Sequence, residues 1–80
     1  MGTNKYNENF NIISHNLKKY RELNNLSQEQ LCNKLALLGI TLYKMDIYRI
    51  ENNKRTVKDF ELWGLSKVFN IDINDLLELK

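Results

Sequence analysis

The chain has 80 residues, 42% of them hydrophobic, with one cysteine, no proline and a formal net charge of +2, which is typical of a single globular domain and excludes a disordered chain. No apolar run approaches the ~18 residues of a membrane span, and the polar start of the chain lacks the apolar core of a signal peptide. Together with Cys32 as the lone cysteine, these features predict a cytoplasmic protein without a membrane association.

Apolar residues recur at helical spacing in five segments, which predicts an all-α domain over residues 10–80 after a flexible segment over residues 1–9. In the first segment Ile13, Leu17 and Tyr20 form one apolar stripe, and the pair Asn24-Asn25 is expected to end the helix. The five predicted helices span about 10–23, 27–38, 42–52, 57–69 and 72–79.

The second predicted helix has clear signals at both ends. Ser27, with Gln30 three residues later, matches a capping box, and Gly39 is a natural C-terminal stop. Its expected buried side chains are Leu31, Leu35 and Leu38.

The remaining helices follow the same logic. The third is expected to turn Ile47 and Ile50 inward and to end at Asn53. Gly64 lies in the middle of the fourth, where it costs about 1 kcal/mol relative to Ala, which predicts a close contact with another helix. Asp72 is the expected N-cap of the last helix. The predicted buried side of the last two helices consists of Phe60, Leu62, Leu65, Val68, Phe69, Leu76 and Leu77.

Charge is distributed unevenly along the chain. Residues 41–58 contain five basic and two acidic side chains, whereas residues 59–80 contain two basic and five acidic side chains. This asymmetry favours a polyanion on one face and solvent or a partner on the other. The alternative is a solvated surface of mixed charge.

The order and spacing of several residues resemble the phage Cro/repressor-type (XRE-like) helix-turn-helix family over residues 13–77. The matching motifs are Leu26-Ser27-Gln28-x-x-Leu31, Ile47-x-x-Ile50-Glu51-Asn52, Lys54-Arg55, Phe69-Asn70-Ile71 and Leu76-Leu77, with Arg21 before the first. The resemblance implies a compact five-helix, lambda-repressor-like DNA-binding domain.

The chain departs from the commonest family pattern at two places. Between Leu31 and Glu51 it has about five more residues, absorbed around 36–42, and the segment Leu37-Leu38-Gly39-Ile40 is similar to a branch with a lengthened second helix. The family usually has Gly where this chain has Asn53, and Asn also tolerates a positive φ.

The resemblance also implies roles for individual residues. Side chains at the start and on the outward face of the third helix would reach base edges, with Lys44 and Arg49 suited to guanine and Asp46 to cytosine or to orienting Arg49. Arg21 and Glu51 would form a structural ion pair between the first and third helices. The implied base contacts are Tyr43, Lys44, Met45, Asp46 and Arg49; the implied phosphate contacts are Gln28, Asn52, Lys54 and Arg55.

Residues that support catalysis or metal binding are scarce. His15 and Cys32 are the only residues of their types, and no metal-ligand spacing or Gly-rich phosphate loop appears. Ser14 and His15 are neighbours in sequence and so point apart on a helix, which makes a nucleophile–base pair implausible. We therefore expect no enzyme activity, no metal and no cofactor.

These observations predict a sequence-specific transcriptional regulator, acting as a repressor, that binds double-stranded DNA as a homodimer and reads the major groove with residues 42–52. Trp63, Leu76, Leu77 and Leu79 are the expected source of the dimer contact. The alternative is a protein-interaction module, such as an antitoxin that binds a partner protein, with DNA binding secondary.

Overall fold

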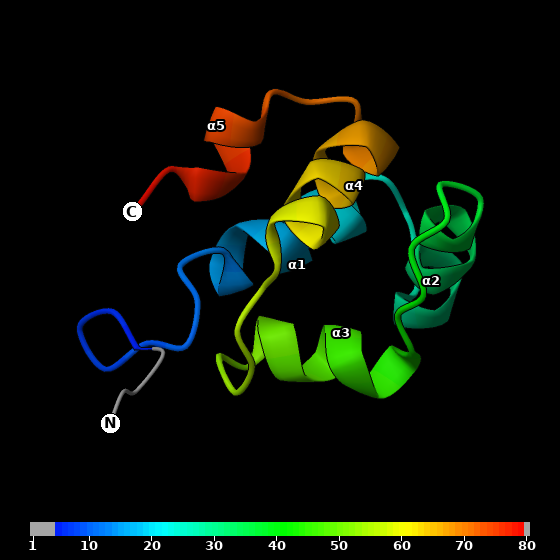
Figure 1. The fold of residues 1–80 in the computed structure, drawn as a ribbon. Coiled ribbons are helices and arrows are strands. Elements are labelled where there is room, and N and C mark those ends of the chain that lie inside the picture. Colours follow the sequence, from blue (N-terminus) through cyan, green and yellow to red (C-terminus); the bar gives the residue numbers. More distant parts are fainter. Residues whose placement is uncertain (1–4, 80) are drawn as a thin grey trace.

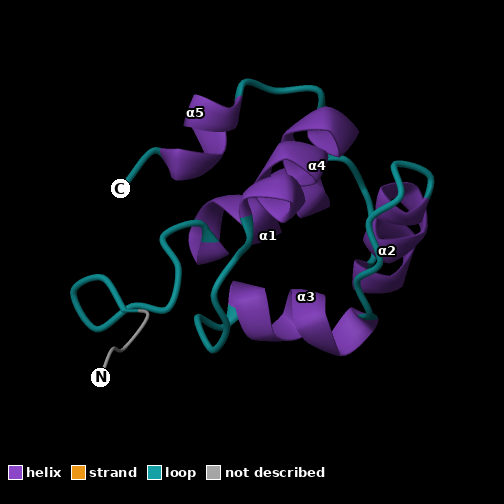
Figure 2. Ribbon diagram, viewed as in Figure 1, coloured by secondary structure: helices purple, strands orange, loops and turns teal. Residues whose placement is uncertain are grey.

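The computed structural model describes residues 5–79, and within that range it contains five α-helices and no named strand (Figures 1 and 2). This confirms the predicted all-α class and the predicted order of five helices. The helices are α1 (Ser14–Leu23), α2 (Gln28–Ala36), α3 (Lys44–Glu51), α4 (Asp59–Phe69) and α5 (Ile73–Leu77). No helix in the described part is long and apolar enough to cross a membrane.

The helices are arranged so that α3 lies at one edge of the molecule. α1 packs against α3, α4 and α5, while α2 packs against α3 and α4. Figure 1 shows α3 below the other helices, with α5 at the opposite side, above α1 and beside the upper end of α4. One side of α3 is therefore covered by α1 and α2, and its other side is open.

The first helix begins at Ser14, later than the predicted start at Phe10. Asn11 explains the difference. Its side chain accepts a hydrogen bond from the N–H two residues later (3.0 Å) and donates to the carbonyls of Ile50 (3.1 Å) and Arg55 (2.9 Å). A buried asparagine thus holds the residues before α1 against the end of α3, where helical hydrogen bonds would have competed.

Asn53 secures the same segment from the other side. Its Oδ1 accepts from the backbone N–H groups of Phe10 (2.8 Å) and Asn11 (3.1 Å), and its Nδ2 donates to Asn9. Asn53 also has a φ of 57°, so it ends α3 as predicted. A glycine at this position could not make these side-chain hydrogen bonds. Before this contact, Tyr6 and Asn9 exchange two backbone hydrogen bonds.

The N-termini of the other helices follow one pattern. Each N-cap residue is extended, and its N–H donates to a side chain three residues later, which fixes the helix start. The capping box at Ser27 and the N-cap at Asp72 are confirmed, whereas the third and fourth helices begin later than predicted. The bonds run from Ser27 to Gln30 (2.8 Å), Tyr43 to Asp46 (2.8 Å), Lys58 to Glu61 (3.0 Å) and Asp72 to Asp75 (3.2 Å).

The second helix is shorter than the predicted span of 27–38, and the additional residues are absorbed in a turn. α2 ends at Ala36, and Gly39, at φ 82°, closes the helix through its N–H to the Ala36 carbonyl (3.0 Å). The next N–H, from Ile40, returns to the carbonyl of Leu35 (3.1 Å). The additional residues therefore form a long turn over 37–43, because glycine in the left-handed region ends the helix before them.

The core lies between all five helices. Ile47, Ile50 and Leu65 are fully buried, as predicted, but Leu38 and Phe60, which were also expected to be buried, are exposed. Leu38 falls in the turn after α2, and helical periodicity does not apply there. The buried hydrophobic residues are Ile13, Leu17, Leu31, Leu35, Ile40, Leu42, Ile47, Ile50, Leu65, Phe69 and Leu76.

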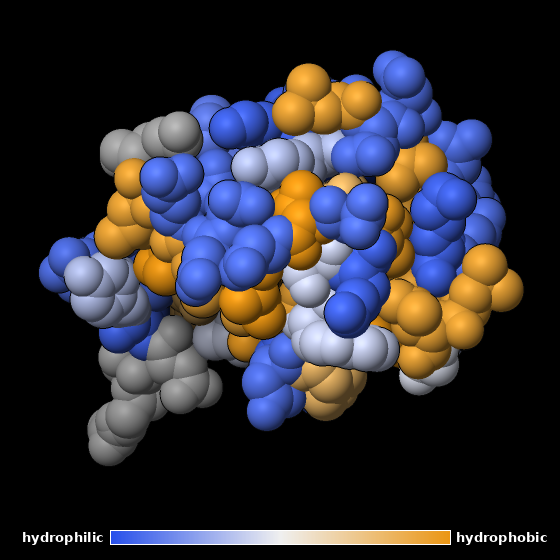
Figure 3. Space-filling view, turned by 90° about the horizontal axis from the view of Figure 1, so that it is seen from above, coloured by the Kyte–Doolittle hydropathy of each residue, from blue (hydrophilic) through white to orange (hydrophobic). Residues whose placement is uncertain are grey.

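Gly64 has the close contact that its position predicts. A Cβ atom on Gly64 would lie 2.3 Å from Ile40 Cδ1 and 3.1 Å from Leu35 Cδ2. The absence of a side chain therefore lets α4 approach α2 and the long turn. The side of the molecule that carries α4 and α5 lies away from α3, and it presents hydrophobic patches separated by hydrophilic side chains (Figure 3).

Candidate nucleic-acid interface

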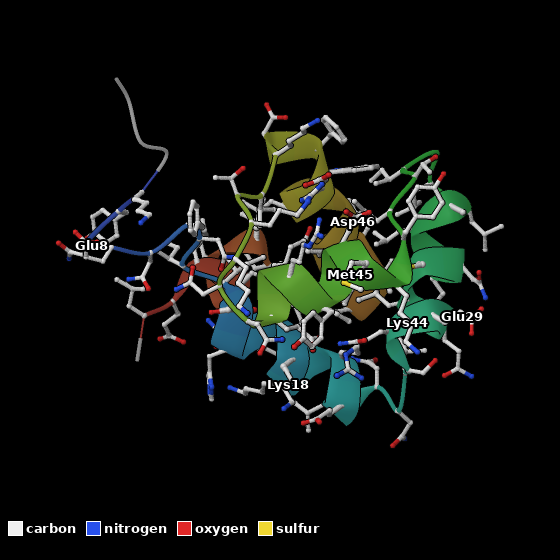
Figure 4. The ribbon with its side chains drawn as sticks, turned by 90° about the horizontal axis from the view of Figure 1, so that it is seen from below. Glu8, Lys18, Glu29, Lys44, Met45 and Asp46 are labelled. Carbon is white, nitrogen blue, oxygen red and sulfur yellow. The ribbon has the colours of Figure 1, made fainter. Side chains whose placement is uncertain are left out.

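The open side of α3 presents one continuous exposed stripe. Ile47 and Ile50 are fully buried, so the residues between them in the helical turn face outward. Figure 4, seen from below, shows Lys44 and Met45 at the start of α3 on this side, with Lys18 of α1 next to the helix. The exposed residues of α3 and its C-cap are Lys44, Met45, Tyr48, Arg49 and Asn52.

The C-terminal end of α3 is held by the predicted Arg21–Glu51 ion pair, which the structure confirms. Arg21 Nε lies 2.6 Å from Glu51 Oε2, and a second nitrogen donates to Oε1 at 3.1 Å. A third nitrogen donates to the Leu26 carbonyl at 2.8 Å. The hydrogen bond to Glu51 raises the pKa of Arg21, although burial acts in the opposite direction. This bidentate contact ties α1 and the start of α2 to the end of α3.

Gln28 lies in the same network. Its Nε2 donates to Glu51 Oε1 at 3.1 Å, which places the first residue of α2 beside the end of α3. The side chain is half-buried. Phosphate contact by Gln28 stays a prediction. The hydrogen bond to Glu51 already orients the Gln28 side chain.

The N-terminal end of α3 is held by a second ion-pair network, which the sequence did not indicate. Arg55 lies in a bidentate contact with Glu61 (2.9 and 3.0 Å), and its Nε is 3.6 Å from Asp46 Oδ1. Asp46 also accepts the N–H of Tyr43, while Glu61 accepts that of Lys58. Two helix starts, those of α3 and α4, are thereby connected through one guanidinium.

This network changes the interpretation of two predicted contact residues. Base contact by Asp46 and phosphate contact by Arg55 stay predictions, but both charged groups are engaged inside the protein. Asp46 pairs with Arg55, so the prediction that it orients Arg49 is wrong. Burial raises the pKa of Glu61, yet hydrogen bonds from Arg55 and the Lys58 N–H outweigh burial, and its pKa is lower than usual.

The other predicted phosphate contacts lie at the exit of α3. Lys54 is exposed, and Asn52 is exposed with its Nδ2 donating to the Tyr48 carbonyl at 2.8 Å. Beyond them, a groove of about 710 Å³ lies between α1 and the end of α3. Its lining includes His15, Lys18 and Lys19. Two lysines thus flank the exposed stripe on its α1 side, together with the acidic Glu22 and Glu51, which also line the groove.

A second groove, of about 810 Å³, lies between α2 and the start of α3. Its lining includes Lys44 and Glu29, and burial raises the pKa of the Cys32 thiol within it. Tyr48 belongs to this groove and to the exposed stripe, although the sequence reasoning did not select it. Its position four residues after Lys44 is the signal that would have found it. The apolar or aromatic lining consists of Cys32, Ala36, Leu42, Tyr43, Met45 and Tyr48.

No group of three or more metal-ligating side chains comes together in residues 5–79. His15 is exposed on α1 and faces the groove with the lysines. Searches against family models, curated proteins and solved structures found no match to this chain.

Proposed function

We propose that the chain is a sequence-specific regulator, acting as a repressor, that binds double-stranded DNA and reads the major groove with α3. The observation that carries the proposal is the arrangement of α3. Its back is fully buried through Ile47 and Ile50, both of its ends are held by ion pairs, and its front exposes Lys44 and Arg49. A helix held in this way presents side chains at fixed positions, as base recognition requires.

The surroundings of α3 support the same function. Phosphates would be held by Lys54 and Asn52 at its exit and by Gln28 at the start of α2, since the N-terminus of a helix favours an anion. The resemblance to Cro/repressor-type proteins is consistent with these roles, and family membership is part of the proposal. We place the activity in the cytoplasm, where the single cysteine would remain reduced.

The decisive experiment is selection of bound sequences from random DNA, followed by titration of the selected site. Replacing Arg49 by Ala should weaken binding to that site by about 1–3 kcal/mol and relax the preference at one base pair. Replacing Lys54 by Ala should weaken all sequences equally and reduce the salt slope by about 0.9 per protomer.

Lys67→Ala is the matched control, because it removes one exposed charge from α4, a helix outside the proposed interface. It should leave sequence preference unchanged. If preference survives in the Lys44→Ala/Arg49→Ala double variant, α3 does not read the DNA.

A homodimer is the form in which we expect this domain to act, because two copies on a two-fold site double the contact with DNA. Leu76 is fully buried in the core, so it is not available for the dimer contact that the sequence predicted. Trp63 and Leu79 remain exposed. Light scattering of the free and DNA-bound chain should give the mass of two protomers; a monomer on an asymmetric site would contradict this.

A second candidate function is a protein-interaction module such as an antitoxin. The observation that favours it is the exposure of Phe60 and Trp63 on α4 and of Leu37 and Leu38 in the long turn. A chain of this kind would retain a specific protein in a pull-down and lose it in the Trp63→Ala variant, with no site selected from random DNA.

A further inference from the structure

We propose that Arg55 is a positioning residue for base reading: it fixes the start of α3 against the start of α4 and thereby sets the base preference of Lys44. This inference rests on the proposed function and assigns part of its specificity to a side chain that does not touch the bases. It gives Arg55 a role inside the protein in place of the phosphate contact that the sequence pattern predicted.

The first step is the direction of the guanidinium. Arg55 Nη1 donates to Glu61 Oε1 (2.9 Å) and to the Thr56 carbonyl (3.0 Å), and Nη2 donates to Glu61 Oε2 (3.0 Å). Arg55 Nε lies 3.6 Å from Asp46 Oδ1, which is an ion-pair distance and too long for a hydrogen bond. The Arg55 side chain is only 23% exposed, whereas its neighbour Lys54 is exposed. A phosphate would have to displace partners that Arg55 already has.

The second step is the task of the two carboxylates. Asp46 accepts the Tyr43 N–H at 2.8 Å, and Glu61 accepts the Lys58 N–H at 3.0 Å. Each carboxylate therefore fixes the first turn of its own helix, α3 or α4. In the helix packing, α3 lies against α1 and α2, while α4 lies against α1, α2 and α5. Arg55 contacts both carboxylates, so one side chain holds the two first turns in a single arrangement.

The third step is the effect on reading. Figure 4 shows Lys44 and Asp46 together at the start of α3. The other end of α3, beside Arg49, is held by the separate Arg21–Glu51 pair. A loosened start would displace Lys44 while Arg49 keeps its place. Because a hydrogen bond to a base edge depends on distance and angle, discrimination should decrease at the base pair that Lys44 reads.

The test measures base preference position by position in the selected site. Lys44→Ala and Arg49→Ala first identify the base pair that each side chain reads. In Arg55→Ala and Arg55→Lys, discrimination at the Lys44 pair should decrease about fivefold, which corresponds to about 1 kcal/mol, the lower limit for a base contact. Discrimination at the Arg49 pair and the salt slope should be unchanged. Lysine is the informative replacement, because it keeps a charge for a phosphate but cannot form the bidentate contact with Glu61.

Asp46→Asn breaks the same link from the other side. It removes the charge that faces Arg55 and keeps an oxygen for the Tyr43 N–H. We expect the same loss of discrimination, and the double variant Asp46→Asn/Arg55→Lys should lose no more than the stronger single variant. Additive losses would mean that Asp46 contacts a base directly, and they would contradict the shared link.

Lys58→Ala is the matched control. It removes an exposed charge at the start of α4 but keeps the backbone N–H that Glu61 accepts, so it should retain full preference at the Lys44 pair. Relaxed preference in this control would show that local charge, and not the ion-pair geometry, sets the preference. Circular dichroism of each variant confirms that it is folded before titration.

Hydrogen exchange of the free chain tests the link without DNA. In Arg55→Lys the amides of Tyr43 and Ile47, which hold the first turn of α3, should lose protection. The amides of Asn52 and Asn53, at the other end of the helix, should keep theirs. Unchanged protection at Tyr43 and Ile47 would refute the positioning role.

The outcomes separate this inference from the proposed function. A chain that selects no DNA sequence refutes the proposed function, and base positioning with it. A chain that selects a site and keeps its preference in Arg55→Lys, with a smaller salt slope in Arg55→Ala, assigns Arg55 to a phosphate and refutes the positioning role alone. Equal losses at the Lys44 and Arg49 pairs would show a general loosening of the domain and would also overturn the inference.

Discussion

Removal of Arg21 is expected to be among the most damaging single changes in this domain. The Arg21 and Glu51 side chains are only 12% and 3% exposed, so Arg21→Ala would leave a carboxylate buried without its cation. Breaking a buried pair in this way costs about 3–5 kcal/mol, in contrast to less than about 1 kcal/mol for an exposed pair. The variant would also leave the Leu26 carbonyl without its donor.

The measurement is urea and thermal unfolding, followed by circular dichroism. For a domain of this size, a loss of about 3 kcal/mol corresponds to a decrease in Tm of roughly 12–24 °C. The control is Arg49→Ala, an exposed arginine of α3 that forms no ion pair with residues 5–79 and whose loss should keep the stability within about 0.5 kcal/mol of the parent. If Arg21→Ala lowered the free energy of unfolding by less than about 1 kcal/mol, the pair would be screened by solvent.

The double variant Arg21→Met/Glu51→Leu distinguishes stability from orientation. Replacing both partners by apolar residues of similar volume is often neutral or stabilising, because no charge remains buried. We therefore expect it to recover most of the stability lost in Arg21→Ala. If it also binds the selected DNA site like the parent, the pair does not orient α3.

Three further predictions follow from single contacts. Arg55 and the Lys58 N–H favour the ionised form of Glu61 in the folded state. The stabilising contribution of Glu61 is therefore present above pH about 4.5 and is lost as the pH decreases through its lowered pKa. The variant Glu61→Gln should flatten the dependence of stability on pH in that acidic range. Gly64→Ala should destabilise by about 1–3 kcal/mol through its clash with Ile40, and the added change Ile40→Val, which removes the clashing Cδ1, should restore part of the loss. Asn53→Gly keeps the left-handed backbone but loses the side-chain acceptor of two N–H groups, so chemical denaturation should show a loss of about 1–3 kcal/mol; no loss would mean that this acceptor is dispensable.

The sequence by itself determined the features that depend on neighbours within a few residues. The five helices, the capping box at Ser27, and the stops at Asn25, Gly39 and Asn53 were predictable because caps and turns are set by local hydrogen bonds and by φ. The inward faces of Ile47 and Ile50 followed from the 3.6-residue period. The Arg21–Glu51 pair came from resemblance, since 30 residues separate its members.

Only the tertiary structure decided which distant groups meet. Asn11 contacts the carbonyl of Arg55 across 44 positions, and Arg55 turns toward Glu61 although the sequence pattern suggested a phosphate. The spacing from Lys44 places Tyr48 on the exposed stripe of α3, but only the tertiary structure places it in a groove beside α2. Periodicity identifies the covered side of a helix, but it contains no information about the element that covers it. That element depends on how the turns orient whole helices, and so on contacts between residues far apart in the chain.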